Sequence, residues 1–198
     1  MIRCLVTDRR RLCGAQAAFD DVRRRLVRQV TEAVDARVDL IQLRERDLAA
    51  ASLAILARDL VRATRGTATR VLVNDRLDVA LACGADGVHL RADSMGADAV
   101  RRIAPAGFLV TRSVHRPDEA ASAGAVDYLV AGTVFPSLSK ADGTRVLGLD
   151  GLAAIVRAAR VPVLAIGGMT ADRVEAVQQA GAAGIAGIGL FMESSGRM

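Results

Sequence analysis

Short apolar runs alternate with longer amphipathic stretches along this chain. Between the runs, apolar residues recur at helical spacing, as at Leu53, Leu56 and Leu60, and Pro117 suits the first turn of a helix. The regular alternation of strand and helix predicts right-handed βαβ units and a parallel sheet. The strands that we expect are Ile2–Thr7, Leu40–Leu43, Val71–Val73, Gly87–Leu90, Leu109–Ser113, Tyr128–Ala131, Val163–Ile166 and Gly184–Ile188.

Eight such units in 198 residues favour closure into a barrel. We therefore predict an α/β fold, a (β/α)8 TIM barrel, with residues 1–198 as a single domain. An open doubly wound sheet is the alternative, but no Gly-x-Gly-x-x-Gly follows the first strand, so its nucleotide-binding version has no support. Only residues 191–198 follow the last strand, too few for a full helix. This shortened helix is absent, reduced to a turn, or supplied by a partner subunit in a homodimer.

Composition agrees with a buried parallel sheet. Hydrophobic residues make up 52% of the chain and aromatic residues 3%, so the core must be built from aliphatic side chains. The net charge is +5, and every basic residue but Lys140 is an arginine. We expect no nucleic-acid partner, because the aromatic stacking platforms of single-strand binders are missing. Arg9–Arg11 and Arg23–Arg25 are expected on solvated surface.

The cysteines and the apolar runs point to a cytoplasmic protein. Cys4, Cys13 and Cys83 are widely spaced, which gives neither a metal-binding pattern nor a disulfide framework. No apolar stretch approaches the length of a membrane span, and no targeting segment precedes the first strand. We expect no membrane contact.

Polar residues and glycines cluster where the expected strands end. In a closed parallel barrel the carboxyl ends of the strands surround one mouth, where active sites lie. Gly167, Gly168, Gly187, Ile188 and Gly189 follow strands seven and eight, and backbone N–H groups that are free of side chains bind phosphate well. This mouth is therefore expected to bind a small phosphorylated molecule.

Cationic residues at the same mouth suit an anionic ligand. Arg44 and Arg46 are two positions apart and point to one side of their strand, so both guanidinium groups can face one anion. Lys140 lies in the long loop 136–147, and its flexible ammonium can follow a moving anionic group.

Two sites of proton or metal chemistry are also conceivable at the strand ends. Asp75 either binds Mg2+ through its carboxylate or caps the following helix. Ser113 and His115 alternate on strand five, and His115 can transfer protons near neutral pH. His89 lies inside a strand and is expected to be structural.

Several stretches resemble the thiamin phosphate synthase and thiazole tautomerase (TenI-like) family. The resemblance covers nearly the whole chain in order. The stretches that carry it are Gln42-Leu43-Arg44-Glu45-Arg46, residues 71–76, residues 84–90, Ser113-Val114-His115, Val134-Phe135-Pro136 with Lys140, and residues 165–170.

The resemblance implies one of two reactions. The synthase joins an aminopyrimidine diphosphate to a thiazole phosphate with Mg2+ assistance, whereas the tautomerase isomerises a thiazole carboxylate phosphate without a metal. For the synthase it implies that Asn74 and Asp75 lie at the pyrimidine and the metal, that Gln42 lies on the pyrimidine side, and that diphosphate contacts come from Arg44, Ser113 and Lys140. Gly168 and residues 187–189 match the cradle of the thiazole phosphate.

Departures from the synthase pattern weaken its metal half. Ser94 replaces an acidic metal ligand, although Asp93 is adjacent, and Ala92 and Gly189 replace the usual glutamine and serine. Arg46 replaces a lysine. Residues 44–46, 112–115 and 167–170 look closer to the tautomerase branch, in which the histidine after Ser-Val serves as acid and base. The main hypothesis is therefore a tautomerase in which His115 transfers the proton, Arg44, Arg46 and Lys140 hold the substrate carboxylate or phosphate, and no cofactor is needed. A synthase with Mg2+ on Asp75 and Asp93 is the alternative, and a catalytically inactive, ligand-binding regulatory barrel is the third possibility.

Overall fold

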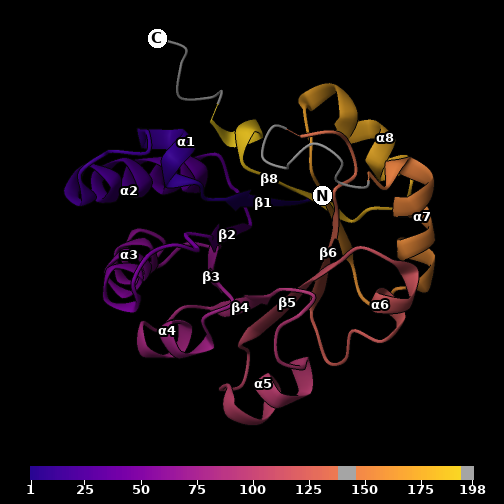
Figure 1. Ribbon diagram of the computed structural model, residues 1–198, viewed down its shortest axis with the longest axis horizontal. Helices are drawn as coiled ribbons and strands as arrows, with labels where there is room; N and C mark the ends of the chain where they lie inside the picture. The colour runs from indigo at the N-terminus through magenta and orange to yellow at the C-terminus, as the bar shows by residue number, and fades with distance from the viewer. Residues whose placement is uncertain (138–145, 193–198) are drawn as a thin grey trace.

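The computed structural model describes residues 1–137 and 146–192. The described residues form a closed barrel of eight parallel strands, each hydrogen-bonded to the next in chain order and the last to the first. Helices surround the barrel (Figure 1). The predicted (β/α)8 fold is confirmed. The strands are β1 (Ile2–Val6), β2 (Leu40–Leu43), β3 (Arg70–Asn74), β4 (Gly87–Leu90), β5 (Leu109–Val114), β6 (Tyr128–Gly132), β7 (Val163–Ile166) and β8 (Gly184–Gly187).

The helices follow the strands as the amphipathic stretches predict. Each strand end lies within one residue of its expected position. The helical elements are α1 (Arg9–Cys13), α2 (Phe19–Asp35), α3 (Ala50–Ala63), α4 (Leu77–Ala82), α5 (Ala97–Ile103), α6 (Pro117–Ala121), α7 (Gly148–Ala158), the 3-10 helix η1 (Ala171–Arg173), α8 (Val174–Gln179) and the 3-10 helix η2 (Gly189–Phe191).

The end of the barrel differs from a full eight-helix ring. Within the described residues, β8 is followed only by η2 and Met192. Within that part of the chain, the helical structure after β8 is a single 3-10 turn. None of the helices in the described ranges is long and apolar enough to cross a membrane.

Two apolar layers fill the fold on opposite sides of the strands. Inside the barrel lie Cys4, Val6, Leu40, Leu72, Val130, Leu164 and Ala186. The alternate residues of the same strands, such as Leu5, Ile41 and Val73, face outward against the helices. Successive side chains of a strand point to opposite faces, so one alternation builds both layers.

Strands β4 and β8 carry glycines where the barrel interior is crowded. A Cβ atom at Gly87 would overlap the carbonyl oxygen of Leu109 and lie 2.6 Å from Cδ2 of Leu72. Gly184 is similarly close to Ile2. These positions admit no side chain without displacing a neighbouring strand.

We predict that Gly87→Ala lowers the free energy of unfolding by about 1–3 kcal/mol, because overpacking displaces backbone. Gly96→Ala is the matched control, since nothing lies within 4 Å of its Cβ position and its φ is −65°. Urea unfolding of both variants checks this. Equal stability of the two would contradict the packing argument.

Candidate active site at the carboxyl ends of the strands

The inward-facing rows of the barrel continue into the site. Leu40 faces the interior, and the same row then carries Gln42, Arg44 and Arg46. In β3 and β5 the corresponding rows lead from Leu72 to Asn74 and from Leu109 through Thr111 and Ser113 to His115. The strand alternation that packs the core thus aims these polar side chains at one mouth.

The mouth holds a cavity of about 660 Å³. This volume is typical of sites for small molecules. It collects most of the residues that the sequence singled out. Those lining it are Gln42, Arg44, Arg46, Asn74, Asp93, Ser113, His115, Gly167, Gly168, Gly187, Ile188 and Gly189.

On the β7 and β8 side, bare backbone forms the wall. Gly167 and Gly168 have φ of +101° and +60°, which L side chains rarely adopt, and a Cβ at Gly168 would lie 2.8 Å from Cβ of Phe135. The N–H groups of Gly168 and Ile188 make no hydrogen bond within the described part of the chain. They are available to a phosphate.

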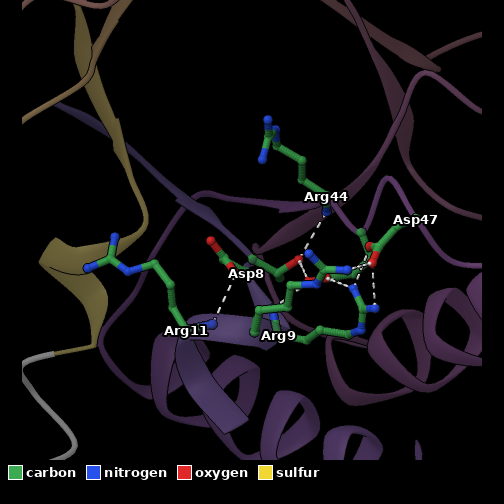
Figure 2. A network of polar contacts seen from close by, with 8 residues as sticks. Asp8, Arg9, Arg11, Arg44 and Asp47 are labelled. Carbon is green, nitrogen blue, oxygen red and sulfur yellow. Dashed lines mark hydrogen bonds and ion pairs between the residues drawn. The ribbon is translucent and has the colours of Figure 1, made fainter. Parts of the chain in front are cut away.

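Arg11 approaches this glycine wall from α1. Its Nη2 lies 3.4 Å from the position that a Cβ at Gly189 would occupy, and Figure 2 shows its side chain extending towards the ribbon of the C-terminal segment. Arg11 also lines the cavity. A cation therefore lies beside Gly189, the residue after Ile188 in the chain, which suits a phosphate bound there.

An amide pair lies on the floor of the cavity between β2 and β3. Nε2 of Gln42 donates to Oδ1 of Asn74 at 2.9 Å, and both residues are buried. This bond uses one donor of Gln42 and the acceptor of Asn74. The oxygen of Gln42 and the NH2 of Asn74 remain for a ligand, which suits a polar heterocycle.

Arg44 is held at its backbone by a buried carboxylate network (Figure 2). Its N–H donates to Oγ1 of Thr7 at 3.0 Å, and that hydroxyl donates to Oε1 of Glu45 at 2.8 Å. The Glu45 side chain is 3% exposed and pairs with Arg9 at 3.2 Å. Burial raises the pKa of the Glu45 carboxyl, against the lowering effect of Thr7 and Arg9.

Arg9 also joins this network to the surface. It binds both oxygens of Asp47 at 2.6 and 2.8 Å, and the bond to Arg9 lowers the pKa of Asp47. The expectation that Arg9–Arg11 is solvated surface is wrong for Arg9, whose side chain is 17% exposed. The alternation of side chains explains why Arg9 is buried. Glu45 lies between two residues that face the mouth, so it points to the other side of the strand, where Arg9 neutralises it.

The guanidinium groups of Arg44 and Arg46 remain available for a ligand. Among the described residues neither makes an ion pair, and both line the cavity. Burial lowers the pKa of Arg44, and the nearby cations Arg46 and Arg91 lower it further. An incoming anion would relieve this repulsion.

Ser113 is positioned by a buried histidine. A hydrogen bond of 2.8 Å joins Nε2 of His89 to Oγ of Ser113, and another of 2.8 Å joins Nδ1 to Oγ1 of Thr111. Burial lowers the pKa of His89 to about 4. His89 therefore stays neutral at pH 7 and orients the serine, consistent with its expected structural role.

His115 is exposed at the cavity rim and has a defined tautomer. Its Nδ1 lies at hydrogen-bond distance from the carbonyl oxygen of Gly132, and its backbone N–H donates to Oε2 of Glu119 at 2.7 Å. A carbonyl oxygen only accepts, so Nδ1 carries the hydrogen. In the neutral imidazole, Nε2 then carries no hydrogen and can accept one from a ligand.

Asp75 adopts an unusual backbone conformation at the end of β3. Its φ is +62°, which is uncommon for a residue other than glycine, and its N–H donates to the carbonyl of His89 at 2.8 Å. Its carboxylate accepts a short hydrogen bond from Ser94. Helix α4 has Arg76 at its N-cap and no capping side chain, so Asp75 does not cap the helix.

The residues around Asp75 do not fit a two-carboxylate Mg2+ site. One oxygen of Asp75 is bonded to Ser94, and Nη1 of Arg91 lies 3.7 Å from the other. Asp93, the second expected ligand, has a side chain 69% exposed and pairs with Nη2 of Arg91 at 2.5 Å. No group of three acidic, histidine or cysteine side chains suited to a metal occurs in the described ranges.

Three arginines that line the cavity were not assigned to the site from the sequence, and one assigned residue lies outside the described part of the chain. Arg11, Arg91 and Arg173 all line the cavity, and Arg173 donates to the carbonyl of Gly168 at 2.5 Å while stacking on Phe135. Arg11 and Arg91 follow strand ends, which was the available signal. Lys140 lies outside the described residues.

The fold and the site define a TIM-barrel protein whose cavity, at the carboxyl ends of the strands, is lined by glycine backbone and arginine side chains. A family profile described as thiamine monophosphate synthase matches residues 11–191. The chain belongs to this thiamin phosphate synthase (TenI-like) family, as its motifs suggested.

Individual relatives agree with this membership. A thiamine-phosphate synthase of Methanoregula boonei is 45% identical over 150 residues, covering 75% of this chain and 69% of that protein. A putative thiamine-phosphate synthase of Geobacter sulfurreducens is 40% identical, covering 92% and 82%. The solved structure of a thiamine phosphate pyrophosphorylase from Pyrococcus furiosus has 35% identity and a TM-score of 0.80, covering 96% and 87%.

These relatives support a place in thiamin biosynthesis. Their names fit the synthase alternative better than the tautomerase hypothesis that the sequence favoured. A 3-hexulose-6-phosphate synthase is also similar, with 19% identity and a TM-score of 0.63, and that likeness shows the fold alone.

We predict that His89 makes stability depend on pH. In the unfolded chain the pKa of His89 is about 6.5, so this imidazole becomes protonated as the pH falls from 7 to 4.5. In the folded protein its pKa is about 4, so it stays mostly unprotonated over the same range. The free energy of unfolding should fall by about 2 kcal/mol over this range from His89 alone. Urea unfolding at both pH values should show a loss smaller by that amount in His89→Asn. An equal loss in both proteins would refute this.

Proposed function

We propose that this protein is a thiamin phosphate synthase. It would join an aminopyrimidine diphosphate to a thiazole phosphate, with release of diphosphate. The observation that carries the proposal is the presence of two anion-receptive regions in one cavity. One is the glycine wall with Arg11, and the other is the arginine group of Arg44, Arg46 and Arg91. Two anionic substrates need two such regions.

Each region suits one substrate. The free N–H groups of Gly168 and Ile188 would hold the thiazole phosphate. The amide pair of Gln42 and Asn74 would bind the aminopyrimidine, whose ring carries hydrogen-bond donors and acceptors. Arg44, Arg46 and Ser113, with Lys140 beyond the described residues, would hold the diphosphate.

The residues would then act by placement and charge. Holding both substrates in one cavity makes bond formation effectively intramolecular. As the new bond forms and the bond to diphosphate breaks, negative charge grows on the leaving group, and the guanidinium groups stabilise that charge. The neutral His89 keeps the Ser113 hydroxyl at this region.

We expect purified protein to release diphosphate only when both substrates are present, in equal amount to the thiamin phosphate formed. Gly168→Ala should raise the KM for the thiazole phosphate about tenfold, because a Cβ there would collide with Phe135 and Pro136 and displace the backbone that carries the free N–H, and should leave the KM for the pyrimidine substrate nearly unchanged. Gly96→Ala is the control. Absence of release at high enzyme concentration, with and without Mg2+, would contradict the proposal.

A thiazole tautomerase is the second candidate, favoured by the state of His115. Its unprotonated Nε2 and its place on the cavity rim suit proton transfer within one bound thiazole. Such a reaction needs a phosphate-binding group and a titratable group. It gives no role to the amide pair of Gln42 and Asn74 on the cavity floor.

The two candidates differ in their dependence on His115. If the protein isomerises the thiazole carboxylate phosphate, His115→Asn should lower kcat by about 10²–10⁴-fold, the usual size of an acid–base contribution. Ultraviolet absorbance or NMR of the thiazole follows the reaction. Wild-type protein that leaves the thiazole carboxylate phosphate unchanged, or equal rates in the two proteins, would remove this candidate.

A further inference from the structure

The loop after β4 places a cation beside the carboxylate of Asp75. The guanidinium of Arg91 lies between two acidic residues, with Nη1 at 3.7 Å from Oδ2 of Asp75 and Nη2 at 2.5 Å from Oδ2 of Asp93. Arg91 belongs to the inward-facing row that begins at Gly87 and His89, so β4 aims it at the mouth. It lines the cavity.

This position is held from several directions. The N–H of Arg91 donates to Oγ of Ser94 at 2.8 Å, and Ser94 is in turn bonded to Asp75. Arg112 on β5 donates to the carbonyl of Ala92 at 2.9 Å and to that of Met95 at 3.2 Å. The loop that carries Arg91 is therefore tied to both neighbouring strands.

The same position disfavours a divalent cation. Mg2+ bound by protein uses one or two carboxylates together with substrate phosphates. Here a guanidinium already faces Asp75, and the neighbouring position 94 carries a hydroxyl in place of a second carboxylate. A dication would meet repulsion from Arg91 at close range.

The local charge balance nevertheless suits an anion. Arg44 and Arg46 line the same cavity as Arg91, and neither makes an ion pair among the described residues. A guanidinium presents parallel N–H groups that match phosphate oxygens, and Arg91 is 41% exposed, so it can turn a donor towards a ligand. The Asp93 partner is mostly exposed, and a pair of that kind contributes little energy.

We propose that the guanidinium of Arg91 replaces a metal ion in this chain. The diphosphate region, formed by Arg44, Arg46 and Arg91, then binds diphosphate through guanidinium groups without Mg2+. The assignment of that region rests on the proposed synthase function. The anion itself is a simpler ligand than either substrate, and its binding can be measured without turnover.

The test is calorimetric titration of the full chain with inorganic diphosphate, in EDTA and in Mg2+. We expect wild-type protein to bind in EDTA, with no tightening on addition of Mg2+. Arg91→Gln should weaken binding at least tenfold, and Arg91→Lys should weaken it less. Arg58→Gln is the matched control, because Arg58 is an exposed arginine on α3 outside the cavity, and it should bind as wild type does.

A second variant tests the metal directly. Arg91→Gly combined with Ser94→Asp removes the cation and supplies a second carboxylate next to Asp75. Diphosphate binding by this double variant should require the metal, and bound Mn2+, observed by electron paramagnetic resonance, should appear in the variant and not in wild type. Circular dichroism verifies that each variant is folded.

Several results would overturn the proposal. These are wild-type protein that binds diphosphate only with Mg2+ or not at all, Arg91→Gln that binds as tightly as wild type, and Mn2+ bound by wild type at this position. Metal-free binding without any diphosphate release from the two substrates would leave the role of Arg91 standing and reject the synthase function. The two failures are thus distinguishable.

Discussion

The alternation of side chains along eight parallel strands is the constraint on which this structure depends. In a closed barrel one half of each strand must face a narrow interior, and that row is apolar at the bottom, as at Leu40 and Leu72. The same row then becomes polar at the carboxyl end, where Gln42 and Asn74 meet. The apolar residues of the core and the polar residues of the site are consecutive parts of one row. A shift of one residue in the strand register would therefore turn both away from the barrel interior.

The charges at the mouth follow from that arrangement. Arg44 and Arg46 face the cavity because Glu45 between them faces away, and Glu45 is neutralised by Arg9 and bonded to Thr7. Arg44 and Arg46 thereby make no ion pair within the described residues and keep their charge for a ligand. Glycines form the opposite wall, since a Cβ at Gly168 would collide with Phe135 and Pro136.

Much of this was predictable from the sequence, because period-two and helical patterns locate strands, and strand ends locate the site. The eight strands and the glycine wall were found in this way. The roles of Arg9 and Arg91 were not, because each depends on a contact between distant segments: Arg9 meets Glu45, and Arg91 meets Asp75. That Asp75 neither caps α4 nor fits a two-carboxylate Mg2+ site could also not be predicted, because it depends on contacts with Ser94 and Arg91 in another segment.

A crystal structure with thiazole phosphate and inorganic diphosphate bound together tests most directly whether one mouth holds two anions. We expect the thiazole phosphate on the N–H groups of Gly168 and Ile188 beside Arg11. The diphosphate should lie separately, against Arg44 and Arg91. Both anions in a single position, or either one outside the cavity, would contradict the two-region site.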